Sequence, residues 1–102
     1  MKDPLKMLRQ VQQMQDRMNK VQADLETETV EATAGGGAIR VVATGTQKLV
    51  SVTIDPAASS EIEMLQDMVV AAVNEAMEKS KELAASKMQA VAAGLGLPPG
   101  LV

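Results

Sequence analysis

The sequence has no cysteine, no histidine and no aromatic residue. The absence of cysteine excludes disulfide bonds and is compatible with the reducing environment of the cytoplasm. Nucleophilic triads and zinc sites usually draw on His or Cys, so both kinds of site lose their usual side chains here. We therefore assign no catalytic residue and no metal ligand, and we expect a protein that is not an enzyme and holds no cofactor.

Long apolar runs are also missing. No apolar stretch approaches the ~20 residues that a membrane-spanning helix needs. Residues 1–20 carry polar side chains throughout, whereas a signal peptide has an uninterrupted apolar stretch. The sequence therefore predicts a cytoplasmic protein without a membrane partner.

The length of 102 residues predicts a single domain, 1–102, with a small core. The apolar residues are Val, Leu, Ile, Ala and eight Met, so the large burial that aromatic side chains contribute is absent. A small domain of this kind gains stability from a disulfide, a metal or a partner subunit. Because Cys and His are absent, we expect a homo-oligomer.

Charge is segregated along the chain, whose formal net charge is −3. The first 20 residues hold five basic and two acidic residues, a net charge of +3, and residues 21–102 hold five basic and eleven acidic residues, a net charge of −6. Nucleic-acid binding depends mainly on Lys and Arg at phosphates. The beginning of the chain has the charge that such binding needs, although the chain as a whole does not.

Residues 1–26 are expected to form a helical arm. Pro4 suits the first helical turn, and apolar residues follow it at intervals of 4, 3, 4, 3 and 4: Met7, Val11, Met14, Met18, Val21 and Leu25. This heptad spacing predicts a helix that packs through a narrow seam against another helix. A polar stripe lies one position before the seam and contains Lys6, Gln13, Arg17 and Lys20, with Arg9 nearby. Such a stripe can contact phosphates, and it is equally typical of the solvated flank of a coiled coil.

Residues 27–55 change to a period of two, which predicts three strands within 27–34, 38–44 and 48–55. Val50, Val52 and Ile54 share one face of the third strand. The segments 35–37 and 45–47 are short enough for hairpins, so an antiparallel meander is expected. Gly35 to Gly37 are read as a turn, because they lack the Gly-Lys-Ser/Thr ending of a phosphate-binding loop.

Residues 60–93 predict a long second helix, with a break along it left open, and residues 94–102 an irregular tail. Ser60 and Glu63 have the spacing of a capping box at the helix start. Three lysines on this helix, Lys79, Lys81 and Lys87, are offset by glutamates, which favours intrahelical pairing. The fold class is therefore α+β, in the order α-β-β-β-α.

Four segments, taken in order, resemble the YbaB/EbfC family of bacterial nucleoid-associated proteins: QQMQDRM at 12–18, VTIDP at 52–56, EMLQDMVVAAVNEAMEKSKE at 63–82 and GLGLPPG at 94–100. The resemblance implies a tweezer-shaped homodimer, in which the sheets and part of the last helix form the interface and paired helices project as arms that contact DNA. The family's genes often lie among recombination and repair genes, which makes proteins of those processes candidate partners.

Carried onto this chain, the resemblance suggests two sets of residues. The candidate DNA contacts are Lys2, Lys6, Arg9, Arg17 and Lys20, with Lys79, Lys81 and Lys87 as a weaker group. The candidate dimer interface comprises Val50, Val52, Ile54, Leu65, Val69 and Val73.

The favoured function is that of a nucleoid-associated protein that binds double-stranded DNA largely through its phosphate backbone, in nucleoid organisation and in gene regulation or DNA repair. Without aromatic residues to stack on bases, duplex DNA is favoured over single strands. Readout of base edges by Arg and Gln of the first helix stays open. The alternative is a dimeric scaffold or adaptor that binds a partner protein through its helical arms, which the acidic net charge favours slightly.

Overall fold

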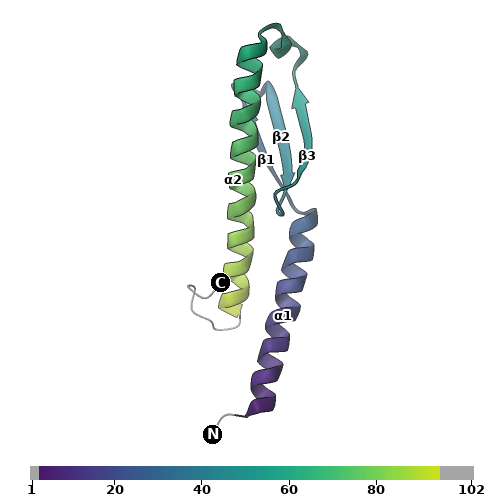
Figure 1. Ribbon diagram of the computed structural model, residues 1–102, viewed down its shortest axis with the longest axis vertical. Helices are drawn as coiled ribbons and strands as arrows, with labels where there is room; N and C mark the ends of the chain where they lie inside the picture. The colour runs from purple at the N-terminus through teal and green to yellow at the C-terminus, as the bar shows by residue number, and fades with distance from the viewer. Residues whose placement is uncertain (1–2, 95–102) are drawn as a thin grey trace.

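In the computed structural model, which describes residues 3–94, one long helix packs along a three-stranded sheet and a second long helix extends from the end of the sheet, beside the first (Figure 1). The order is α1 (Pro4–Thr27), β1 (Thr29–Ala34), β2 (Ile39–Thr44), β3 (Leu49–Ile54) and α2 (Ile62–Gly94). This order confirms the predicted α-β-β-β-α class. The chain measures 71 × 22 × 15 Å, and its radius of gyration of 19.3 Å exceeds the roughly 13 Å of a compact domain of 100 residues.

Helix α1 begins where the sequence favours a start. The Asp3 side chain accepts a hydrogen bond from the Leu5 amide at 3.0 Å, and Pro4 occupies the first turn, where its missing N–H loses nothing. At the other end the Thr27 hydroxyl donates to the Asp24 carbonyl at 3.1 Å. Glu28 then leaves the helix in an extended conformation, and β1 follows directly.

The three strands form an antiparallel meander in the order β1-β2-β3. All three glycines of the turn Gly35–Gly37 have positive φ, a conformation that residues with a Cβ rarely adopt. In the pairing of β2 with β3, Val42 lies opposite Ser51 and Ala43 lies opposite Leu49, so the register shifts there by one residue. Val50 is the extra residue of this bulge.

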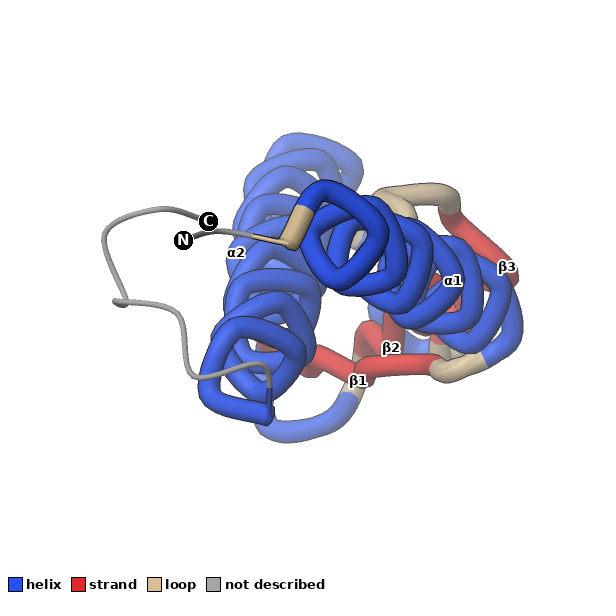
Figure 2. Tube along the Cα trace, turned by 90° about the horizontal axis from the view of Figure 1, so that it is seen from below, coloured by secondary structure: helices blue, strands red, loops and turns tan. Residues whose placement is uncertain are grey.

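The core lies between the sheet and α2. It contains Ala32 of β1, Ile39, Val41 and Ala43 of β2, and Ala72 and Ala76 of α2. The alanines of this core let α2 approach the sheet closely, so α2 and the sheet form two layers. When the molecule is seen from below, α1 lies nearest the viewer (Figure 2). Helix α2 packs chiefly on β1 and β2. Every residue of β3 is exposed, so the third strand is left outside this core.

The start of α2 corrects one prediction. The capping box of Ser60 and Glu63 is not formed, because Asp55 and Pro56 begin a short 3₁₀ turn, Pro56–Ser60, before the helix. Ser60 belongs to that turn, where its hydroxyl donates to the Ala57 carbonyl at 3.1 Å, and Glu61 is the residue that directly precedes α2, which begins at Ile62.

Helix α2 then continues without a break to Gly94, which belongs to the helix and not to the predicted tail. The remainder of that predicted tail, residues 95–102, lies outside the described residues. None of the helices described is both long enough and apolar enough to cross a bilayer.

Candidate nucleic-acid interface

Helix α1 is held at its C-terminal end and projects from the body at its N-terminal end. Leu25, near the end of the helix, is 3% exposed, whereas Leu5 and Val11 in the first turns are 65% and 62% exposed. The helix runs beside the C-terminal half of α2 and extends past the described end of α2 (Figure 1). Helix α1 therefore forms an arm, and the first half of this arm is accessible to a large ligand.

The predicted cationic stripe lies on this arm. The side chains of Lys6, Arg9, Arg17 and Lys20 belong to exposed residues, and none of the four takes part in an ion pair within residues 3–94. Lys2, the fifth candidate, lies outside the described residues. From Lys6 to Lys20 the helix rises about 21 Å, and Asp16 is the one acidic residue in that interval. This cationic stripe can therefore face several consecutive phosphates of a duplex.

Arg17 lies next to the end of α2, a contact that the sequence did not predict. A Cβ placed on Gly94 would lie 2.8 Å from Nη1 of Arg17, so the guanidinium reaches the last turn of α2. The carbonyls in the last turn of a helix carry partial negative charge, which favours a cation at this position. Together these elements border an open hollow of about 430 Å³, lined by Met7, Gln10, Val11, Gln13, Met14, Arg17 and Gly94. Heptad spacing alone could not show that α2 ends opposite Arg17.

The weaker candidates lie on α2, away from the arm tip. Lys79 forms an ion pair with Glu75 one turn earlier, at 3.6 Å, which confirms intrahelical pairing for this lysine. Its ammonium also donates to the Glu31 carbonyl at 2.9 Å. Lys87 differs from the prediction, because it pairs with Glu28 at 3.0 Å and not with a residue of its own helix.

Lys81 is exposed and borders a second hollow, of about 330 Å³, at the root of the arm. The other residues that line this hollow are Gln22, Leu25, Gly45, Thr46, Gln47 and Ala84. No ion pair involves Lys81 within the described part of the chain. Of the three lysines on α2, it is the one with an uncommitted ammonium group.

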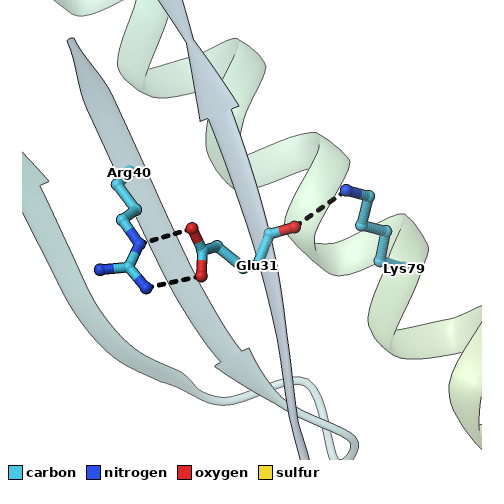
Figure 3. Close-up of polar contacts among 3 residues, drawn as sticks. All are labelled: Glu31, Arg40 and Lys79. Atoms are coloured by element: carbon cyan, nitrogen blue, oxygen red, sulfur yellow. Dashed lines mark hydrogen bonds and ion pairs between the residues drawn. The ribbon is translucent and has the colours of Figure 1, made fainter. Parts of the chain in front are cut away.

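Another basic residue, Arg40, forms an ion pair on the surface of the sheet. Its Nε and Nη2 donate to the two carboxylate oxygens of Glu31 at 2.5 and 2.6 Å, and Figure 3 shows this pair beside Lys79. The hydrogen bond from Arg40 lowers the pKa of Glu31, and the same bond raises the pKa of Arg40. Because the two residues lie diagonally across β1 and β2, nine positions apart in sequence, no local pattern predicts the pair.

An apolar surface follows β3 on the side of α2. Val52 and Ile54 lie opposite the buried residues Val41 and Ile39, and opposed residues in a sheet share a face. They are nevertheless 40% and 41% exposed, since α2 does not cover β3. Val50, at the bulge, is 58% exposed.

The other three predicted interface residues lie on α2. Leu65, Val69 and Val73 are half-buried and pack against the core of their own chain. Val70, beside them in sequence, is 59% exposed. An apolar surface on β3 is thus accompanied by apolar residues on α2.

Comparison with known proteins identifies the class. A nucleoid-associated protein of Ruminiclostridium cellulolyticum is 46% identical over 97 residues, which cover 93% of this chain and 84% of the relative. One from Dictyoglomus turgidum is 40% identical over 103 residues, with 99% of both chains covered. An uncharacterised Helicobacter pylori protein of known structure shares the fold, with a TM-score of 0.72 and 20% identity over 80% of this chain and 88% of that chain.

The family model described as the YbaB/EbfC DNA-binding family matches residues 1–95. The chain belongs to this family of nucleoid-associated DNA-binding proteins, as its sequence resemblance indicated. The family is not a family of enzymes.

Proposed function

We propose that this protein acts as a homodimer that binds duplex DNA at the nucleoid, through contacts between phosphates and the cationic stripe of α1. The observation that carries the proposal is the state of Lys6, Arg9, Arg17 and Lys20: all four are exposed on a projecting helix and are free of ion pairs within residues 3–94. Unpaired cations are the groups that gain most from replacing counterions at phosphates. Most acidic residues after position 20 lie on other elements, and Asp24 and Glu26 lie in the last turn of α1, far from its tip.

The small core and the exposed strand β3 support the proposed dimer. Four of the six core residues are alanines, so one protomer buries little apolar area. Strand β3 is an edge strand with no charged residue between Leu49 and Ile54, and an uncharged edge of this kind readily pairs with another chain. We place the interface on Val50, Val52 and Ile54 of β3, with Leu65, Val69 and Val73 on the adjacent flank of α2.

Two arms in one dimer double the number of cations available to a duplex. If six to ten phosphates are contacted, affinity should fall by roughly 10³- to 10⁵-fold between 50 and 200 mM salt. Contacts to phosphates position a protein without reading sequence, so affinity for duplexes of different sequence should be similar. Nucleoid organisation is the role that such binding supports, and gene regulation or DNA repair would build on it.

Fluorescence anisotropy with a labelled duplex of mixed sequence tests the proposal. The parent protein is compared with a variant in which Lys6, Arg9, Arg17 and Lys20 are replaced by Glu, and with the control Arg40→Glu, whose parent side chain is already paired on the sheet. We expect the arm variant to lose binding and the control to retain it. Binding that does not change across the salt range, or that survives in the arm variant, overturns the proposal.

A scaffold or adaptor that grips a protein partner is the second candidate. It is favoured by Leu5 and Leu8, which are 65% and 53% exposed on the arm and are not needed for phosphate contacts. Recombination and repair proteins are the partners we would test. A pull-down of such proteins that persists after nuclease treatment supports the adaptor, and one that nuclease abolishes supports bridging by DNA.

A further inference from the structure

We propose that the ion pair between Glu28 and Lys87 sets the direction of the arm, which makes Lys87 a positioning residue and not a contact to phosphate. The inference rests on the proposed function of α1. It concerns the junction between the arm and the body, a region for which the sequence pattern makes no prediction.

Glu28 is the single residue between α1 and β1, and its backbone is held from both sides. Its N–H donates to the Asp24 carbonyl of α1 at 2.9 Å, and its carbonyl accepts from the Gly45 amide of the turn after β2 at 3.0 Å. The chain changes here from helix to an extended conformation. Glu28 is therefore the point about which α1 would turn relative to the sheet.

The side chain of Glu28 ties this point to α2. Its Oε1 accepts a hydrogen bond from the Lys87 ammonium at 3.0 Å. Its Oε2 has almost no accessible surface and no hydrogen-bond partner in the described structure. A carboxylate that is partly desolvated in this way depends on its cation, because removal of one partner leaves an uncompensated charge.

No other ion pair joins the arm or its junction to α2 within residues 3–94. Leu25 is the one buried residue of α1, and three more apolar residues of its seam, Met14, Met18 and Val21, are half-buried. The Glu28 and Lys87 side chains are 41% and 33% exposed, so solvent screens this pair only in part.

The length of α1 amplifies any change at the junction. Its 24 residues extend about 36 Å from Glu28. A rotation of about 10° at the junction would therefore move the tip by about 6 Å, which exceeds the roughly 3.4 Å rise per nucleotide of one DNA strand. A small loss of restraint at Glu28 is enough to take the cationic stripe out of register with the phosphates.

The experiment combines a charge swap with a direct measurement of arm position. Because the chain has no cysteine, spin labels can be placed at Gln12→Cys on α1 and Ala71→Cys on α2, both exposed. Pulsed electron paramagnetic resonance, recorded on labelled protein diluted with unlabelled protein, then gives the distance between the two spin labels of one chain. The variants are Lys87→Met, Glu28→Gln and the swap Glu28→Lys with Lys87→Glu. Lys81→Met is the control that removes a lysine from the same helix without breaking an ion pair.

We expect Lys87→Met and Glu28→Gln to broaden or shift the distance and to weaken duplex binding by about tenfold, which corresponds to about 1.4 kcal/mol. The swap should restore both. Lys81→Met should leave the distance unchanged. Circular dichroism checks folding, and Lys87→Arg, which keeps the charge, should behave like the parent.

Two results would overturn the inference. An unchanged distance in Lys87→Met means that the pair does not set the arm. If the swap restores the distance but not the affinity, Lys87 contacts a phosphate directly, because a glutamate at position 87 cannot make that contact. If the parent protein bound no DNA, the proposed function would fail, and the distance measurement would still decide whether the pair holds the arm.

Discussion

Gly45 lies against Leu25 so closely that a methyl group on its α-carbon would sit 2.5 Å from Leu25 Cδ2 and 3.0 Å from the Leu25 carbonyl oxygen. This contact joins the end of α1 to the turn between β2 and β3. Gly45 also donates its amide proton to Glu28. The absence of a side chain at position 45 is therefore a condition for seating the root of the arm.

We expect Gly45→Ala to lower the free energy of unfolding by about 1–3 kcal/mol, because the added methyl overpacks a site with no space for it. Urea unfolding followed by far-ultraviolet circular dichroism measures this change, since the chain has no tryptophan for fluorescence. Gly36→Asn is the matched control. Gly36 has nothing within 4 Å of an added Cβ, and Asn tolerates its positive φ of 68°. Equal losses in the two variants would contradict the close packing of Gly45 on Leu25.

Ser80 is a fully buried polar residue of α2 that fixes the same turn. Its hydroxyl donates to the Thr44 carbonyl at 2.7 Å and accepts from the Gln47 amide at 3.1 Å. We expect Ser80→Ala to destabilise the fold by about 1–3 kcal/mol, since both backbone groups would lose the hydroxyl and keep only the 3.1 Å hydrogen bond from the Gln47 amide to the Thr44 carbonyl. Ser86→Ala, at an exposed position of the same helix, should change stability by no more than about 0.5 kcal/mol. A neutral Ser80→Ala would contradict this role of the hydroxyl.

The ion pair of Arg40 and Glu31 predicts a dependence of stability on pH. Arg40 holds the pKa of Glu31 below its ordinary value of 4.5. A lowered pKa in the folded state stabilises the fold above that ordinary value, and the contribution is lost as pH falls through the lowered pKa. Arg40→Gln should therefore lower the unfolding temperature slightly at neutral pH, because both side chains are exposed.

In strong acid, where Glu31 is protonated with or without Arg40, the parent and Arg40→Gln should unfold at the same temperature. Glu31→Gln should match Arg40→Gln at neutral pH, and the double variant should lose nothing further. Thermal unfolding at several pH values measures all four proteins. A difference between parent and Arg40→Gln that is constant with pH would contradict this account.

The proposed interface on β3 predicts a change in molecular mass. Val52 faces the side of α2 and Ser51 faces the opposite side, since their partners in β2 are the buried Val41 and the half-buried Val42. We expect Val52→Asp to break the dimer, because a carboxylate would be desolvated between protomers. Ser51→Asp should leave it intact.

Sedimentation equilibrium should give the parent twice its chain mass of 10.7 kDa and Val52→Asp a single chain mass. Circular dichroism distinguishes a folded monomer from an unfolded chain. A parent protein that sediments as one chain, or a dimer that survives Val52→Asp, would place the interface elsewhere or remove it.

Local patterns predicted the elements of this fold well. The seam from Met7 to Leu25 identified α1 because helical spacing is a property of neighbouring residues. The change to period two identified the strands, and Gly35–Gly37 identified the first turn. The capping prediction failed because Pro56 starts a 3₁₀ turn that includes Ser60, so α2 begins only at Ile62, which the spacing of Ser60 and Glu63 does not reveal.

Local sequence patterns could not predict the ion pairs between elements. Lys87 and Glu28 lie 59 positions apart, and Arg40 and Glu31 meet only because of the register between β1 and β2. The cationic stripe was found because its members share one helix. Whether a given lysine forms an ion pair depends on how α2 packs, and the periodicity of the sequence does not reveal that packing.

The alanine-rich core affects how the protein folds in the cell. A single chain with so few large buried side chains gains little by folding alone, so much of its stability should arise as two chains meet. Folding and assembly would then be one event, and the unfolding temperature would rise with protein concentration. The amount synthesised would thus help to decide how much of the protein exists in folded form.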